Sequence, residues 1–300
     1  MKVFYHDDND GKCAAYQVYL YAKLNNVDIN KKDFYPVNYN DKTPDASLIE
    51  KGEEVYIVDY SFTEATIDKL LAISFKANGN VHWFDHHKSS LEVLDYVKAT
   101  NICKSVCIDM ERSGALITYD TLIKGTNSDD ECIKHVVELV DDHDRWVHAI
   151  PESKLFNLGS IVFPNGPCDN IWHSDPNDVI DKGVSISEYT NIANLKACRQ
   201  GKYLIKINDK RCVVLNTPIK SSEALSTYFE KYGLAIRWSF NGQNFEYSVY
   251  STLEDVDCSA IAKHFNPAGG GHKGAAGFTS DKLLFKDGFS YRIKGATINK

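Results

Sequence analysis

Four short segments in the first half of the chain bring carboxylates and imidazoles close together in sequence. They are HDDND at 6–10, Asp59 at the end of VYIVD, DHH at 85–87 and DDHD at 141–144. Carboxylates crowded in this way repel one another unless a cation lies between them. Hard divalent cations such as Mn²⁺ and Mg²⁺ prefer carboxylate oxygens, and imidazole favours transition metals. These residue types therefore predict a site for divalent metal ions.

The segment HDDND taken alone also fits a solvated turn or a helix cap, because Asp and Asn are common in both. In an extended segment alternate side chains share a face, so His6, Asp8 and Asp10 are expected to point the same way. The recurrence of Asp59 and of the 85–87 triplet in the same half of the chain favours the metal interpretation.

Each of the first three segments follows a predicted strand. The apolar runs are KVFYH (2–6), VYIV (55–58) and NVHWF (80–84), and amphipathic helices are expected at 11–24 and at 64–77, the latter capped by Thr63. Alternating strands and helices predict an α/β fold with a doubly wound parallel sheet. Ligands bind beyond the carboxyl ends of such strands, so the polar clusters are expected to converge there.

The rest of the chain divides into helices, an irregular stretch and a strand-rich end. Helices are expected at 113–123, 130–146 and 185–200, and the stretch after Pro151 is interpreted as a connector because it is rich in Gly and Pro. From Lys202 the pattern becomes strand-like, with turns at 208–209 and in NGQN at 241–244. The predicted organisation is a catalytic domain at 1–150, a connector and linker helix at 151–200, and a smaller α+β domain at 201–300.

Composition and charge limit the classes of function. The chain has 300 residues, 43% of them hydrophobic, and contains no apolar run of signal-peptide or membrane-spanning length, so we expect a cytoplasmic protein without a membrane partner. Its eight scattered cysteines form no zinc or disulfide pattern and are expected to be free thiols. The net charge of −7 gives no long-range attraction for a long polyanion, so a phosphate-bearing substrate should be short.

The order of the motifs resembles a known family. HDDND, VDYSF, DHH and DDHD, followed far downstream by GGGHKGAAGF, resemble the DHH phosphoesterase superfamily, in the branch that carries a DHHA1 domain. Within that branch the chain is most similar to the oligoribonucleases that degrade nano-RNA and to related nucleotide phosphodiesterases. The resemblance extends from residue 6 to residue 278 and implies a DHH catalytic domain followed by a DHHA1 substrate-binding domain.

The resemblance also implies two divalent metal ions, with manganese expected and magnesium as the alternative. The ligands it implies come from all four segments: His6, Asp8, Asp10, Asp59, His86 and Asp142. Asp59 would bridge the two ions. The aspartate of the 141–144 segment is open among Asp141, Asp142 and Asp144, and Asp142 is chosen because an Asp-x-Asp-x-x-Trp-like family pattern resembles this stretch, which ends at Trp146.

Catalytic roles follow from the same resemblance. Asp85 would support the site from behind the ligands, and His87 would face the substrate and donate a hydrogen bond or a proton near the leaving oxygen. Two cations about 3.5–4 Å apart would deprotonate a bridging water, and the resulting hydroxide would attack phosphorus in line.

The glycine-rich segment near the C-terminus is the second candidate site. Consecutive glycines can bring backbone N–H groups close to an anion, although a flexible linker is the alternative interpretation. The family often has Ser-x-Arg-Ser on the preceding strand, whereas this chain has SVYS, so Tyr250 replaces an arginine and could stack on a base. The candidate substrate-binding residues are Gly269, Gly270, Gly271, His272 and Tyr250.

We therefore expect a metal-dependent phosphodiesterase that hydrolyses short oligonucleotides to mononucleotides. The alternatives are hydrolysis of a cyclic dinucleotide or of adenosine 3′,5′-bisphosphate, and a catalytically silent nucleotide sensor. A silent site should have lost one of the metal ligands, and all of them are present. RNA against DNA, the polarity of cleavage and the oligomeric state, a homodimer included, stay open at this stage.

Overall fold

The computed structural model describes residues 1–39, 42–218, 225, 228 and 231–296, apart from the side chains at 194 and 197–200. The chain divides into two compact units, Met1–Ile186 and Ser187–Lys300. Each unit is described by itself below.

The first unit is built on a parallel sheet of five strands in the order β2-β1-β3-β4-β5. The strands are β1 (Lys2–His6), β2 (Phe34–Val37), β3 (Val55–Val58), β4 (Val81–Asp85) and β5 (Ser105–Ile108). The central strands are buried on both faces, which explains why they are continuous apolar runs. The predicted doubly wound parallel sheet is confirmed.

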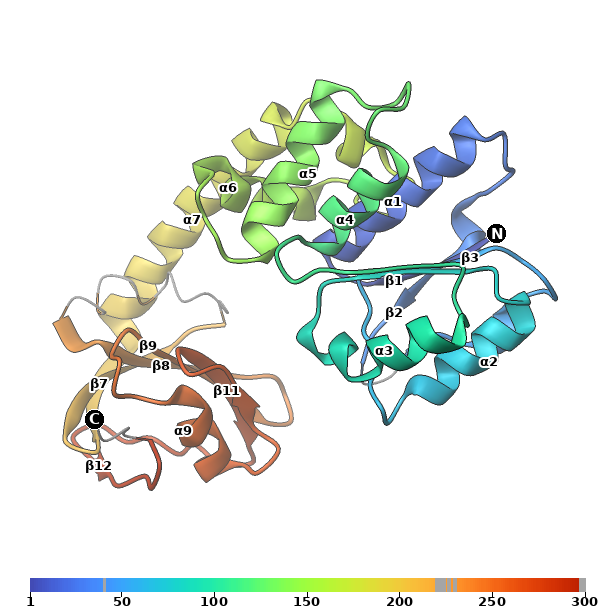
Figure 1. Cartoon of the computed structure of the whole chain (residues 1–300). Coiled ribbons are helices and arrows are strands. Elements are labelled where there is room, and N and C mark those ends of the chain that lie inside the picture. The colour runs from blue at the N-terminus through green and yellow to red at the C-terminus, as the bar shows by residue number, and fades with distance from the viewer. Residues whose placement is uncertain (40–41, 219–224, 226–227, 229–230, 297–300) are drawn as a thin grey trace. The chain divides into compact units, whose positions relative to one another are not determined.

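Helices cover both faces of this sheet (Figure 1). One face carries α1 (Asn9–Leu24), α4 (Gly114–Leu122) and α5 (Glu131–Asp144), and the other carries α2 (Ile67–Ala77) and α3 (Leu91–Thr100). The strands alternate between two cores: Tyr56 and Val58 pack with α1, whereas Ile57 packs with α2 and α3. The sheet is therefore held between two layers of helices.

Helix α2 begins three residues later than predicted. Its N-cap residue is Thr66, and the helix starts at Ile67. The residues before it form a turn in which the Thr66 N–H donates to the Thr63 carbonyl and the Thr63 N–H donates to Thr66 Oγ1, both at 2.9 Å. Thr63 therefore begins this turn and does not cap the helix.

The predicted connector is divided between the two units. Helix α6 (Pro151–Gly159) and the start of α7 (Asn177–Gly201) belong to the first unit, where Phe156 and Trp172 join the core of α1 and α5. Helices α6 and α7 approach closely, since a Cβ on Gly183 would lie 1.8 Å from the Leu155 carbonyl oxygen. Gly159, a residue of the predicted connector, is also needed for this packing, because a Cβ there would lie 1.8 Å from the Val179 carbonyl oxygen. Helix α7 begins eight residues before the predicted 185.

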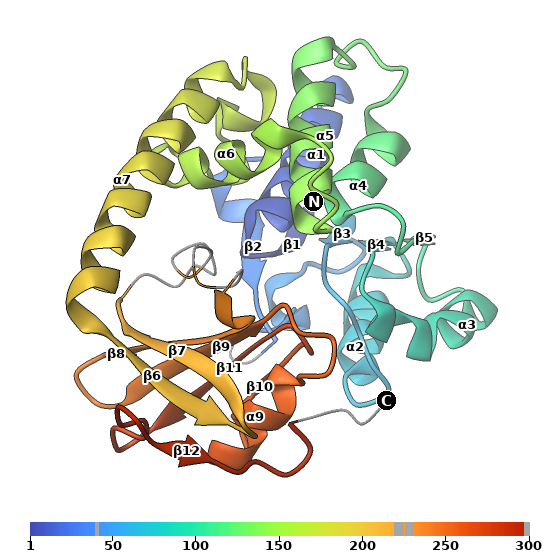
Figure 2. The same ribbon diagram turned by 90° about the vertical axis from the view of Figure 1, so that its left-hand side faces the viewer.

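The second unit contains a mixed sheet of seven strands in the order β10-β11-β9-β8-β7-β6-β12 (Figure 2). The strands are β6 (Lys202–Ile207), β7 (Lys210–Asn216), β8 (Leu234–Phe240), β9 (Phe245–Ser251), β10 (Gly270–Gly271), β11 (Ala275–Ser280) and β12 (Ser290–Tyr291). Helix α9 (Cys258–Phe265) packs on one face. The antiparallel pairs β6–β7 and β8–β9 confirm the hairpins predicted at 208–209 and 241–244.

Two expectations from composition can be compared with the described residues. None of the helices in the described part of the chain combines the length and the apolar character needed to cross a membrane. The cysteines with described side chains are free thiols: Cys13, Cys103, Cys107, Cys132, Cys168, Cys212 and Cys258. Cys198 lies among the side chains that are not described.

Candidate metal centre

The candidate site lies where the strand order of the first sheet reverses. Strand β1 has β2 on one side and β3 on the other, so the connections leave β1 in opposite directions and open a crevice at its carboxyl end. His6 ends β1, Asp59 follows β3 and Asp85 ends β4. The three strands are neighbours, so the first three polar segments meet at one edge of the sheet as predicted.

Asp59 is the central residue of this edge. Its backbone is left-handed, with φ of 55°, and its N–H donates to the Phe84 carbonyl at 2.8 Å, which holds the residue beyond the last ladder position of β3. The side chain is 1% exposed. Neither carboxylate oxygen makes a hydrogen bond with a described residue, and a buried carboxylate left this way is costly unless a cation compensates it.

The two oxygens of Asp59 face two different groups of donor atoms. Oδ2 lies 3.6 Å from His6 Nδ1, which is itself 2.8 Å from Asp8 Oδ2. Oδ1 lies 3.2 Å from His86 Nε2. A carboxylate with one oxygen toward each group has the arrangement of a ligand that bridges two metal ions.

The second group gathers around the imidazole of His86. Nε2 lies 3.4 Å from Asp144 Oδ2 and 3.7 Å from Asp10 Oδ2. The ligand atoms of His6, Asp8 and Asp59 lie within 4.8 Å of one another, as do those of Asp10, His86 and Asp144. Both sets contain only oxygen and imidazole donors, which fits Mn²⁺ or Mg²⁺.

Asp10 is held by the start of a helix. Its carboxylate accepts hydrogen bonds from the backbone N–H groups of Gly114 at 2.7 Å and Ala115 at 2.9 Å. A Cβ on Gly114 would lie 2.7 Å from Asp59 Cβ and 3.0 Å from Asp10 Oδ2, so only glycine fits between the two acids. The expected extended comb is not formed, because Asp8 is the N-cap of α1 and Asp10 lies in its first turn. A strand-to-helix turn brings them together instead.

Asp144, and not the chosen Asp142, contributes the side chain from the 141–144 segment. The Asp142 carboxylate turns to the following loop, where it accepts from the N–H groups of Ala149 at 2.8 Å and Ile150 at 3.2 Å. The Asp141 carboxylate pairs with Arg145 and accepts from the Ser113 N–H at 2.7 Å. Geometry therefore replaces Asp142 with Asp144 in the candidate ligand set.

Helical spacing could have selected Asp144 from the sequence. Ile133, Val137, Val140 and Asp144 are separated by four, three and four residues and form one face of α5. The first three are buried in the core that α5 shares with α1 and α4, so the same face carries Asp144 at the end of the helix.

Asp85 and His87 lie beside the cluster and contact each other. Asp85 is fully buried, its Oδ1 is 2.7 Å from His87 Nδ1, and its Oδ2 accepts from the Ser90 hydroxyl. The carboxylate therefore fixes the ring of His87, which is partly exposed. His87 Nδ1 also lies 3.8 Å from Asp59 Oδ1.

Burial and like charge shape the electrostatics of the cluster. Burial, and then the neighbouring Asp10 carboxylate, raise the pKa of Asp59 well above its usual range and the pKa of Asp144 to about 7. Contacts with the Asp59 and Asp8 carboxylates raise the pKa of His6 to about 10. All three shifts express a shortage of positive charge among the acids, which divalent cations would supply.

Tyr39 is a neighbour of the site that the sequence analysis missed. Its ring stacks on Tyr60 at a centroid distance of 4.8 Å and lies 5.5 Å from the ring of His6 and 5.9 Å from that of His87. Tyr39 follows β2, so the strand-end rule applies to it too. The signal was missed because Pro36 makes FYPV a weak strand pattern, and β2 is an edge strand where proline is tolerated.

The substrate-binding candidates of the second unit lie on neighbouring strands. Gly270 and Gly271 form β10, which pairs with β11, and Tyr250 on β9 is opposite Ala275 of β11. His272 is exposed in the turn between β10 and β11, where its N–H donates to the Ala275 carbonyl at 2.7 Å. The segment is thus a hairpin and not a flexible linker. Its binding role stays a prediction.

Comparison with known proteins gives structural likenesses only. No protein-family model matches the chain, and no curated protein matches its sequence. A pGpG-specific phosphodiesterase from Vibrio cholerae is 14% identical with a TM-score of 0.56, over 93% of each chain. An exopolyphosphatase-related protein from Bacteroides fragilis is 12% identical with a TM-score of 0.54, over 94% of this chain and 87% of that one.

A third structure makes the likeness explicit. It is a DHH domain from a member of the s1p family of ribosomal proteins, 14% identical with a TM-score of 0.55, over 92% of this chain and 81% of that one. These likenesses cover nearly all of the present chain, and they agree with the order of motifs from residue 6 to residue 278. The chain has the fold of the DHH-domain proteins.

Proposed function

We propose that this chain is a metal-dependent phosphodiesterase that hydrolyses short oligonucleotides to mononucleotides. The observation that carries the proposal is the Asp59 carboxylate, which is buried, receives no hydrogen bond from the described residues and faces a donor group with each oxygen. The proposed ligands are His6, Asp8, Asp10, Asp59, His86 and Asp144. Manganese is the proposed ion, with magnesium as the alternative.

The protein side chains hold and orient the reacting groups. When bound, two divalent cations supply Lewis acidity at a phosphate and lower the pKa of water. Asp59 holds the two donor groups at one edge of the sheet, and Gly114 keeps the space between Asp59 and Asp10 free. Asp85 fixes the imidazole of His87, which places a donor for the leaving oxygen beside the cluster.

Two observations support a short nucleotide substrate. The net charge of −7 disfavours a protein that follows a long polyanion. A structure of the same fold is named a pGpG-specific phosphodiesterase, and pGpG is a dinucleotide. Another is named exopolyphosphatase-related, so polyphosphate is a necessary comparison substrate.

A cleavage assay tests the proposal. The purified chain is incubated with Mn²⁺ and 5′-labelled RNA of two, five and twenty-four nucleotides, and in parallel with a cyclic dinucleotide, adenosine 3′,5′-bisphosphate and polyphosphate. We expect fastest turnover of the dinucleotide, with loss of turnover on chelation. Preference for the bisphosphate or the cyclic dinucleotide would keep the metal site but change the substrate. Binding of all substrates without turnover would contradict the proposed hydrolase.

The chain offers a matched pair of variants for this assay. Asp59→Asn removes the charge between the two donor groups, whereas Asp7→Asn removes an exposed carboxylate in the same segment that pairs with Lys12 instead. Activity should be lost in the first variant and kept in the second.

A further inference from the structure

One tryptophan is exposed beside the candidate metal centre. Trp146 has 74% of its surface exposed, whereas Trp83 and Trp172 are fully buried. It follows Asp144 by two residues, immediately after the end of α5. An exposed aromatic side chain contributes little to the core, and beside a polar site its ring is available to a ligand.

The backbone holds Trp146 in an unfavourable conformation. Trp146 and His148 are both left-handed, with φ of 56° and 50°. Non-glycine residues stay in this region only when surrounding interactions hold them there. Asp142 provides them: its carbonyl oxygen accepts from the Val147 N–H at 3.0 Å, and its carboxylate accepts from Ala149 and Ile150. The loop is therefore built to present the indole.

Three aromatic rings form a cluster in this loop and at the end of α5. The Trp146 ring lies 6.5 Å from that of His143 at 26°, so the two planes are nearly parallel, and 5.1 Å from that of His148 at 80°. The Nδ1 atom of His143 is buried and makes no hydrogen bond with the described residues. A flat, polarisable surface of this kind suits a planar heterocycle.

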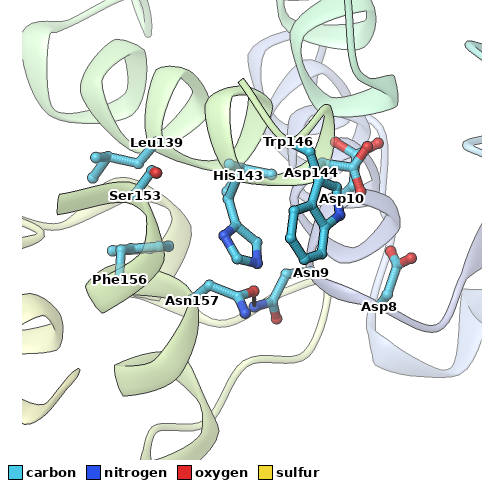
Figure 3. Close-up of a pocket in the computed structure, with 11 residues that line it drawn as sticks. Asp8, Asn9, Asp10, Leu139, His143, Asp144, Trp146, Ser153, Phe156 and Asn157 are labelled. Carbon is cyan, nitrogen blue, oxygen red and sulfur yellow. Dashed lines mark hydrogen bonds between the residues drawn. The ribbon is translucent and has the colours of Figure 1, made fainter. Parts of the chain in front are cut away.

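A cavity of about 200 Å³ connects these rings with the metal centre (Figure 3). Its acidic residues lie at one end, Leu139 and Phe156 lie at the other, and the rings of Trp146 and His143 lie between them. The cavity is smaller than the roughly 300–1,000 Å³ of pockets that enclose drug-sized ligands, so it suits one ring system. The residues that line it are Asp8, Asn9, Asp10, Leu139, Val140, His143, Asp144, Trp146, Ser153, Phe156 and Asn157.

Two side-chain amides in the cavity can read the edge of a planar ring. Asn9 Nδ2 donates to Asn157 Oδ1 at 2.6 Å and to Ser160 Oγ at 2.9 Å. These bonds use Asn9 Nδ2 and Asn157 Oδ1. Among the groups that the structure describes, Asn9 Oδ1 and Asn157 Nδ2 are therefore available to a ligand. One acceptor and one donor side by side match the hydrogen-bonding edge of a nucleobase.

We propose that the cavity beside Trp146 binds the base of the nucleotide whose phosphate lies at the metal centre. Trp146 and His143 stack on the base, Asn9 and Asn157 contact its edge, and Asp142 is a positioning residue that holds the Trp146 loop. The proposal rests on the proposed phosphodiesterase function and deepens it, because it requires a substrate with a base and excludes bare polyphosphate as the preferred one.

Binding of AMP and of ribose 5-phosphate in Mg²⁺ tests the base site without turnover. Both probes carry the phosphate, and only AMP carries a base. We expect AMP to quench the fluorescence of Trp146, and Trp146→Ala to weaken AMP binding, followed by calorimetry, roughly 5- to 150-fold. Trp146→Phe should retain most of the affinity but lose the quenching. Equal weakening for both probes in Trp146→Ala, or none for either, would overturn the proposal.

The cleavage of a dinucleotide provides the second measurement. Trp146→Ala should raise KM with little change in kcat, and a dinucleotide with one abasic position should lose this sensitivity. Phe75→Ala is the control, because Phe75 is also an exposed aromatic residue, 90% exposed on α2 at the other face of the sheet. If no phosphodiester is cleaved but AMP still binds through Trp146, the proposed function fails while the base site stands. If phosphodiesters are cleaved but KM does not change in Trp146→Ala, the proposed function stands and the base site fails.

Discussion

The carboxylate cluster of the first unit and the glycine segment of the second are both predicted from sequence as binding sites, but packing explains them to different degrees. A Cβ on Gly269 would lie 2.7 Å from Phe278 Cβ, and one on Gly271 would lie 2.6 Å from the Ala275 carbonyl oxygen. Of the three consecutive glycines, only Gly270 has open space beside it. Packing therefore accounts for two of these glycines without any ligand.

The cluster has no such explanation within the fold. The buried oxygens of Asp59 receive no hydrogen bond from described residues, and the neighbouring acids raise each other's pKa values. Burial of an unpaired carboxylate costs several kcal/mol, so the cluster requires a compensating interaction such as a bound cation. The difference teaches that unsatisfied polar atoms indicate a ligand more strongly than a glycine motif does.

The largest expected effect is that of Asp59→Asn. We expect activity to fall by about 10³-fold or more, since a bridging ligand contributes several kcal/mol through the metals it holds. Because burial raises the pKa of Asp59, its charge destabilises the metal-free fold, and the metal-free Tm should stay equal or rise. Steady-state kinetics and thermal unfolding measure the two effects. Substantial residual activity would contradict the interpretation that the cluster, unlike the glycine segment, requires a bound ligand.

Asp144→Asn and Asp142→Asn sharpen the comparison inside one helix. Loss of the Asp144 carboxylate should weaken Mn²⁺ binding about 10- to 100-fold with little loss of stability. Loss of the Asp142 charge weakens the hydrogen bonds to Ala149 and Ile150 and should lower the free energy of unfolding by about 1–2 kcal/mol. Calorimetric titration of Mn²⁺ and urea unfolding separate the two. The reverse pattern would restore Asp142 as the ligand.

Gly271→Ala and Gly270→Ala test the glycine segment in the same way. Gly271 has φ of 142° and no room for a methyl group, so its substitution should destabilise the second unit by about 2 kcal/mol. At Gly270 the nearest atom to a new methyl group would be Lys263 Cε at 3.9 Å, so stability should be unchanged. Amide hydrogen exchange in β11 reports the difference. A raised KM in Gly270→Ala at unchanged stability would show that this segment also contacts the substrate.

The last prediction concerns the pH dependence of metal binding. The pKa of Asp144 is raised to about 7, so its carboxyl holds a proton below this pH in the metal-free protein. The stability of the metal-free fold therefore falls as the pH rises toward 7. Metal binding requires the charged form, so stabilisation by Mn²⁺ should increase as the pH rises through 7. We expect the gain at pH 7.5 to exceed that at pH 5.5 by about 2 kcal/mol. An equal gain in Tm at both values would contradict this assignment.

The sequence alone was sufficient for features that depend on neighbours along the chain. Alternating apolar runs and amphipathic segments predicted the parallel sheet, and polar residues after the strands predicted the edge where His6, Asp59 and Asp85 meet. The hairpin at 208–209 followed from local turn residues. These features are encoded locally, because strand and helix periods and turn conformations depend on a few consecutive residues.

Only the tertiary structure decided the features that depend on packing between distant segments. Asp144 and Asp142 are both aspartates of one helix, and the packing of α5 against α1 and α4 brings the first to His86 and turns the second to the loop of Trp146. Gly159 resembles a connector residue until α7 is placed against it. Sequence by itself determined which residues stand at the strand ends; the strand order and the packing of α5, neither of which a local pattern encodes, decided which of their side chains meet.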